Sequence, residues 1–72
     1  MKYYVAEVAG LHSFAKAEKI EAKTRTSAKR SASRYQMFQT TVLYIGRAVN
    51  DNGFIIEPIA VKKGNRWLDL DL

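Results

Sequence analysis

The chain of 72 residues contains no cysteine, one proline and one histidine. Without cysteine it forms no disulfide framework and no thiolate metal site, which fits a reducing compartment. A single histidine without cysteine also excludes a catalytic triad, a Cys–His pair and a histidine zinc site within one chain. Apolar runs are only a few residues long, so no membrane-spanning segment is expected.

The four glycines are isolated from one another, so no glycine-rich phosphate loop is present. Together with the shortage of catalytic side chains, this predicts a protein that is not an enzyme and uses no metal or cofactor. The opening residues carry an acid, Glu7, where a secretory signal peptide needs an apolar stretch. We therefore expect the chain to act in the cytoplasm.

What the sequence does contain is typical of a small globular domain. Hydrophobic residues make up 47% of the chain, too many for a disordered protein. No linker, repeat or low-complexity tract divides it, so residues 1–72 are expected to form one domain. A domain of this size buries only about 60% of its unfolded surface, so a partner or a second copy would add stability. Monomer and homodimer both remain open.

Two short strands are expected in the first third of the chain. Residues Lys2–Val8 are rich in Tyr and Val, which favours a strand, and a loop around Gly10 follows. Residues 14–23 are ambiguous between strand and helix. Their composition favours a helix, whereas apolar and charged residues alternate in the second half, as in a strand. We interpret this stretch as a strand from Ala17 to Lys23.

An amphipathic helix is predicted next, ending near Gln39. Thr26 or Ser27 supplies the N-cap hydroxyl, and the β-branched residues 40–42 favour a return to strand. At 100° per residue the apolar side chains gather on one stripe, which consists of Ala28, Ala32, Tyr35 and Phe38. The small alanines permit close approach of the helix to a sheet.

Three strand-like runs then follow, at residues 41–49, 54–61 and 66–72, separated by turns at 50–53 and 62–65. The first is apolar on both alternating faces, as in a central strand. Pro58 interrupts the second, which places it at an edge or a bulge. In the third, strict alternation predicts inward Leu68, Leu70 and Leu72 and outward Trp67, Asp69 and Asp71.

The expected fold class is therefore α+β. The order is strand, strand, helix, strand, strand, strand, with one helix packed on a small, mainly antiparallel sheet of 4–5 strands.

Positive charge is concentrated in one part of the chain. The formal net charge is +5, and residues 14–34 contain seven basic and two acidic residues. Elsewhere basic and acidic residues balance, so the whole net charge lies in this segment.

On the predicted helix, Lys29, Arg30 and Arg34 lie opposite the apolar stripe as an outward basic face. Other cations crowd the helix N-terminus, where acids are normally favoured. Such departures from a local rule are expected at functional sites, and free amides beside cations favour phosphate. The candidate nucleic-acid-binding residues are therefore Lys23, Arg25, Lys29, Arg30 and Arg34, with nearby hydroxyls as further donors. The plainer interpretation is a solvated face.

Trp67, expected on the outer face of its strand, is a candidate for stacking on a ligand, packing on a cation or covering the sheet. Asp69 and Asp71 share that face. Two carboxylates are weak evidence for a cation, and they predict that a polyanion docks on the helix side instead. His12 is interpreted as a polar loop residue.

The stretch from Lys19 to Ile45 resembles small bacteriophage and prophage proteins of uncharacterised function. A strand, a basic helix start around Ala28-Lys-Arg-Ser-Ala32 and a second strand carry this resemblance, which covers just over a third of the chain. It implies a bacterial-cell setting and DNA-related or host-directed roles.

The function expected from the sequence is that of a small basic binding module that contacts nucleic-acid phosphates by charge neutralisation, without sequence readout. The alternative is a protein-interaction module. It would bind an acidic host-protein surface through the same basic face, or self-associate through a sheet edge.

Overall fold

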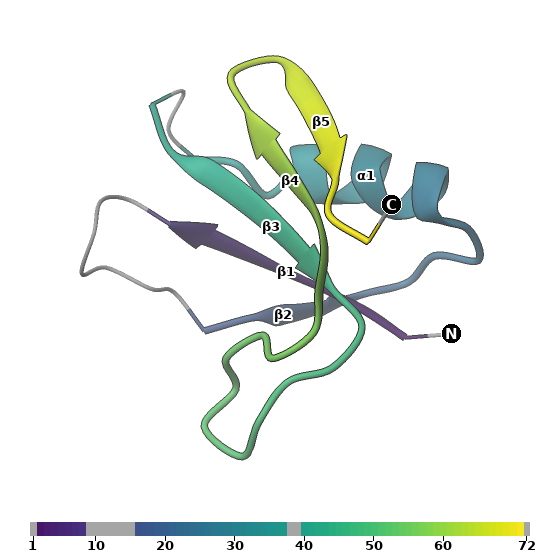
Figure 1. The fold of residues 1–72 in the computed structure, drawn as a ribbon, viewed down its shortest axis with the longest axis vertical. Coiled ribbons are helices and arrows are strands. Elements are labelled where there is room, and N and C mark those ends of the chain that lie inside the picture. Colours follow the sequence, from purple (N-terminus) through teal and green to yellow (C-terminus); the bar gives the residue numbers. More distant parts are fainter. Residues whose placement is uncertain (1, 9–15, 38–39, 72) are drawn as a thin grey trace.

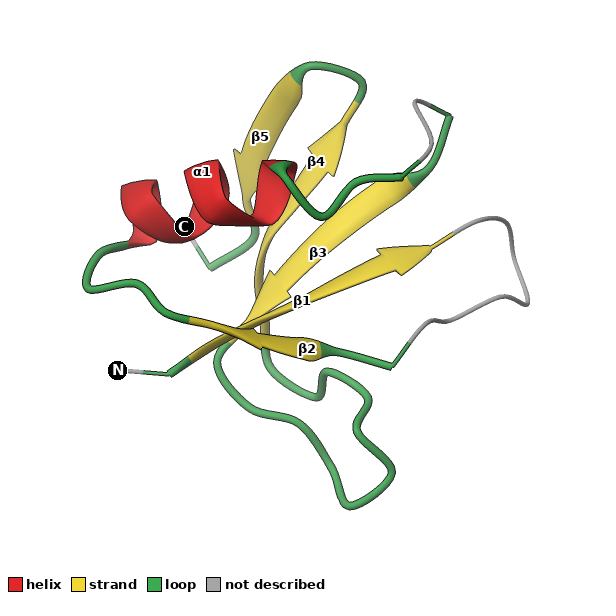
Figure 2. Cartoon of the chain, turned by 180° about the vertical axis from the view of Figure 1, so that it is seen from behind, coloured by secondary structure: helices red, strands yellow, loops and turns green. Residues whose placement is uncertain are grey.

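A computed structural model describes residues 2–8, 16–37 and 40–71 of the chain. Within these residues, five antiparallel strands form one sheet in the order β2-β1-β3-β4-β5, and a single helix, α1, packs against one face of it (Figures 1 and 2). The elements are β1 (Tyr3–Val8), β2 (Glu18–Ile20), α1 (Arg25–Ser33), β3 (Val42–Gly46), β4 (Pro58–Lys63) and β5 (Arg66–Asp69). The predicted α+β class and element order are confirmed.

The core lies between α1 and the middle of the sheet. β3 is the central strand, as its apolar faces predict, and its Leu43 and Ile45 side chains are fully buried. On the helix side, Ala28 and Ala32 are also fully buried. Because a methyl group occupies little space, these two positions let the helix axis approach the strands closely.

The helix differs from the prediction at both ends. Its N-cap is Thr24, whose hydroxyl accepts from the Ser27 amide at 3.1 Å, rather than Thr26 or Ser27. It ends at Ser33 instead of continuing to Gln39, which lies outside the described residues. The Met37 amide donates to the Glu7 carboxylate at 2.9 Å, so a residue distant in sequence takes a donor that the helix would have used.

Strand β5 presents the opposite face from the one predicted. Trp67 packs against the core, while Leu68 and Leu70 are 47% and 46% exposed. The cause is register: Gly64, with φ of +62°, and Asn65 form a two-residue turn that pairs Lys62 with Trp67 and Ala60 with Asp69. Directly paired residues point to the same face of a sheet. The side chains of β5 therefore point to the same faces as the β4 residues with which they pair. Leu72 lies outside the described residues.

The connection from β3 to β4 contains the predicted turn. Asn50 accepts two backbone amides through its side chain, and Gly53 has φ of +85°. Pro58 is the first residue of β4 and pairs with Gly46 at a register shift, which confirms its predicted place at a bulge. The strand expected from residue 54 therefore begins later, with Ile55 in an isolated bridge to Val49.

The strand expected over residues 17–23 is also present but shorter, as β2. Within the described parts of the chain, no helix is long and apolar enough to cross a membrane.

Candidate nucleic-acid interface

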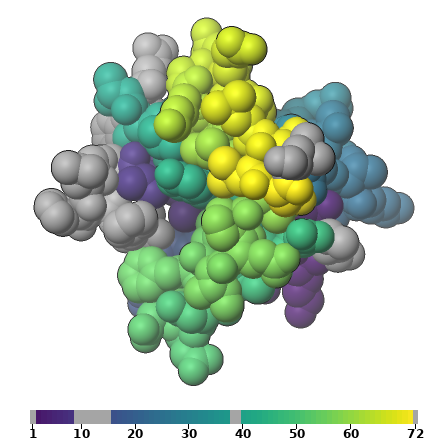
Figure 3. Space-filling view, viewed as in Figure 1, coloured from purple at the N-terminus to yellow at the C-terminus, as the bar shows by residue number. Residues whose placement is uncertain are grey.

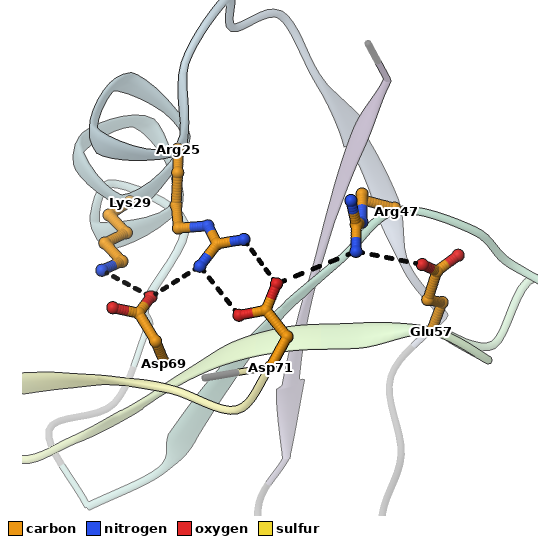
Figure 4. A network of polar contacts seen from close by, with 6 residues as sticks. All are labelled: Arg25, Lys29, Arg47, Glu57, Asp69 and Asp71. Carbon is orange, nitrogen blue, oxygen red and sulfur yellow. Dashed lines mark hydrogen bonds and ion pairs between the residues drawn. The ribbon is translucent and has the colours of Figure 1, made fainter.

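The first turn of α1 contains no acidic residue of its own, although cations surround it. The missing carboxylates come from the C-terminal end of the chain. Arg25 donates to both oxygens of Asp71, at 2.8 and 2.6 Å, and to Asp69 at 3.2 Å (Figure 4). This two-point contact restrains the orientation of the guanidinium relative to the Asp71 carboxylate. The local conflict at the helix start is therefore resolved by residues more than forty positions away.

The contact extends into a larger ion-pair network. Lys29 lies 3.0 Å from Asp69, and Arg47 lies 3.2 Å from Glu57 and 3.8 Å from Asp71. In Figure 3 the end of the chain that follows β5, in yellow, packs directly on the segment leading into β4, in green. The network joins three cations to three anions and so has no net charge; its members are Arg25, Lys29, Arg47, Glu57, Asp69 and Asp71.

The network changes the acidity of its own groups. The hydrogen bond from Lys29 holds the pKa of Asp69 below its ordinary value, and the hydrogen bond from Arg25 does the same for Asp71. Partial burial opposes both shifts without cancelling them. Conversely, the hydrogen bond with Asp71 raises the pKa of Arg25.

These shifts predict that the free energy of unfolding falls at acidic pH. The carboxylates have lower pKa values folded than unfolded, so their contribution is fully present above the ordinary Asp pKa of about 3.9. It is lost as pH falls from there through the lowered folded values. Urea unfolding followed between pH 6 and pH 2 measures this loss. A double Asp69→Asn, Asp71→Asn variant should show a flatter profile, and an unchanged profile would contradict the role of the network.

The five candidate cations are thus divided into two groups. Arg25 and Lys29 are partly buried and neutralised, so the outward basic face predicted for Lys29 is wrong. Lys23, Arg30 and Arg34 are exposed, and within the described parts of the chain their side chains have no ion pair or hydrogen bond. We call these three the exposed cations. Arg34 keeps helical backbone angles, so it lies one turn from Arg30 on the same helix face.

A groove adjoins the exposed cations between the end of α1 and the edge strand β2. Its volume is about 400 Å³, and its lining includes the cations Lys19 and Arg34 and the ring of Tyr35. A smaller hollow of about 180 Å³ lies on the other side of Tyr35 and is lined by Lys16, Glu18 and Met37 among others. From the sequence, Tyr35 is expected in the apolar stripe of the helix, and Lys19 is not among the candidate binding residues. The adjacent Arg34-Tyr35 pair was the available signal, because cations beside aromatics are common in nucleic-acid grooves.

Other candidates from the sequence have structural explanations. Trp67 is half-buried against the core, so its predicted outward position is wrong. Asp69 and Asp71 point toward α1 and not away from it. Within the described residues, no group of three or more His, Cys, Asp or Glu side chains is placed to hold a metal ion. His12 lies outside the described residues.

The chain was also compared with known proteins. No protein-family model matches it, and no curated protein matches it either.

Proposed function

We propose that this protein is a small binding module that contacts nucleic-acid phosphates through Lys23, Arg30 and Arg34. The observation that carries the proposal is the division of the cations around α1. Two are neutralised by Asp69 and Asp71, whereas the exposed cations have no partner among the described residues. Because these cations break no ion pair with a described residue when they contact a ligand, they are the groups available to a polyanion.

The contact would act by charge neutralisation. Arg30 and Arg34 are about 6 Å apart along the helix axis, at 1.5 Å per residue, so they would contact one strand at nearby phosphates. Exposed hydroxyls of Thr26 and Ser27 lie within a turn of Arg30 and would add neutral donors. Nothing in this arrangement reads bases in a duplex groove. The proposed setting is the cytoplasm of a bacterial cell, in a non-enzymatic role.

Substitution of the exposed cations tests this function. Replacing Lys23, Arg30 and Arg34 with Gln should lower the affinity for a short duplex or single strand by roughly tenfold or more at low salt. The slope of log affinity against log salt should also flatten by about 2.7, because each phosphate contact in B-DNA contributes about 0.9. Fluorescence anisotropy at 50 to 200 mM salt measures both quantities.

A matched control loses the same charge elsewhere. Lys2, Lys63 and Arg66 are exposed residues outside the candidate interface, and their replacement by Gln should change affinity much less. Equal losses in the two triple variants would show that only net charge matters and would contradict a site on α1. Binding of poly-glutamate as tightly as of an oligonucleotide would favour an acidic protein as the partner.

Self-association through a sheet edge is a second candidate function, favoured by the facing of β5. This edge strand presents Leu68 to solvent, and Leu70 directly after the strand is exposed too, so two large apolar residues lie beside the edge of the sheet. Such an edge is a template for pairing with another chain. Sedimentation of the wild type and of a Leu68→Lys variant tests it, since a dimer that forms at this edge should dissociate on the substitution, and a wild type that sediments as a monomer would contradict self-association.

A further inference from the structure

Tyr35 occupies an unusual position at the end of the helix. Its amide donates to the Ala32 carbonyl at 2.9 Å, which closes a tight final turn beyond the helix. The residue is 42% exposed, although the helical periodicity predicted it inside the core. Because α1 ends at Ser33, the ring is directed to the surface instead, where it lines both hollows beside β2.

The chain that follows Tyr35 is held firmly. The Gln36 side chain donates to the Thr41 carbonyl at 3.2 Å and accepts from Lys62 at 3.0 Å. The Met37 amide bonds to the Glu7 carboxylate. With the final helical turn on one side and these bonds on the other, the backbone at Tyr35 is fixed. An aromatic side chain on a fixed backbone loses little conformational entropy when a flat ligand stacks on it.

Charge around Tyr35 favours an anionic ligand in the larger groove. Arg34 and Lys19 contribute cations to the lining, and Ser31 contributes a hydroxyl. Glu21 also lines the groove, at 3.8 Å from the Lys19 ammonium, and its side chain is 94% exposed. This acid therefore lies at the solvent side, where its charge is screened, while Arg34 has no anionic partner among the described residues.

We propose that this groove receives an unpaired base of a single-stranded nucleic acid, stacked on Tyr35, with the adjoining phosphate on Arg34 and Lys19. This inference rests on the proposed function and specifies its substrate class. A basic groove with an aromatic platform is the usual arrangement for binding single strands. In a duplex both faces of each base are covered by stacking, so duplex DNA gains nothing from Tyr35. A volume of about 400 Å³ lies in the range of pockets for small planar ligands.

The test compares two substitutions at one position. Tyr35→Leu removes the aromatic face and retains bulk, whereas Tyr35→Phe retains the face. We expect Tyr35→Leu to weaken binding of a labelled single-stranded 12-mer by about 5- to 150-fold. Tyr35→Phe should bind it as the wild type does, and both variants should bind a matched duplex unchanged. Amide NMR spectra confirm that each variant is folded, which the exposure of Tyr35 leads us to expect.

The outcomes separate this inference from the function on which it rests. If the exposed-cation triple variant loses affinity but Tyr35→Leu binds the single strand normally, the base site is overturned and the phosphate contact remains. Equal losses for single strand and duplex in Tyr35→Leu would also overturn it. If Tyr35→Leu weakens single-strand binding while the triple variant binds normally, base stacking on Tyr35 stands, but the phosphate contact through Arg34 and the other exposed cations fails.

Discussion

Replacing Asp69 and Asp71 with Asn is expected to raise the affinity for nucleic acid and to lower the stability of the fold. The substitutions release Arg25 and Lys29, which lie 2.6 and 3.0 Å from these carboxylates, beside the exposed cations. Two further phosphate contacts then become available and two repulsive charges disappear. We expect an affinity gain of roughly tenfold or more at low salt, and a salt slope steeper by about 1.8. Anisotropy titrations against the same oligonucleotides measure both.

The loss of stability has a separate cause. Asn retains some hydrogen-bonding capacity but not the charge. Arg25 then remains at the positive end of the helix dipole without compensation, and Lys29 loses its ion pair with Asp69. The midpoint of thermal unfolding should fall by a few degrees.

Asp51→Asn is the control for total charge. It removes one acid from the loop between β3 and β4, which extends away from α1 in Figures 1 and 2. It should alter neither the stability nor the salt slope appreciably. If Asp51→Asn raised affinity as much as Asp71→Asn alone, release of the helix cations would not be the cause.

Truncation of Leu43 to Ala is expected to cost about 2 to 5 kcal/mol of unfolding free energy. The Leu43 side chain is fully buried on the central strand, where β1 and β4 flank it and prevent collapse of the cavity. A domain of this length has a total stability of only about 4 to 11 kcal/mol. The substitution should therefore remove a large share of the stability of the domain. Urea unfolding monitored by Trp67 fluorescence gives the free energy.

Leu68→Ala is the matched control, since it removes the same atoms from a side chain that is 47% exposed. We expect it to cost less than about 1 kcal/mol. The comparison also tests the facing of β5. A loss from Leu68→Ala as large as that from Leu43→Ala would mean that Leu68 points into the core, as the alternation in the sequence had predicted, and that the register of β5 is different.

Much of the fold is predictable from short-range patterns. β-branched and aromatic residues mark β1 and β3, and the two turns are marked by Asn-Gly and Gly-Asn pairs. The change in hydrophobic period marks the helix, and Pro58 marks the bulge because proline has no amide hydrogen to donate. The concentration of positive charge at residues 14–34 is likewise a property of the sequence alone. Each of these depends on the conformational preference or charge of residues close together in the chain.

The tertiary structure alone decided which of those charges are available. Alternation in residues 66–72 defines two faces but does not say which one points into the core. The turn at Gly64 and the pairing with β4 determine which face does. That choice brought Asp69 and Asp71 to Arg25, and a contact across more than forty residues leaves no local signal. Beyond the early end of the helix, the Met37 amide likewise bonds to Glu7 of β1, a partner that is distant in the sequence. Partners distant in sequence compete for the same backbone and side-chain groups, and only the folded chain determines which of them bond.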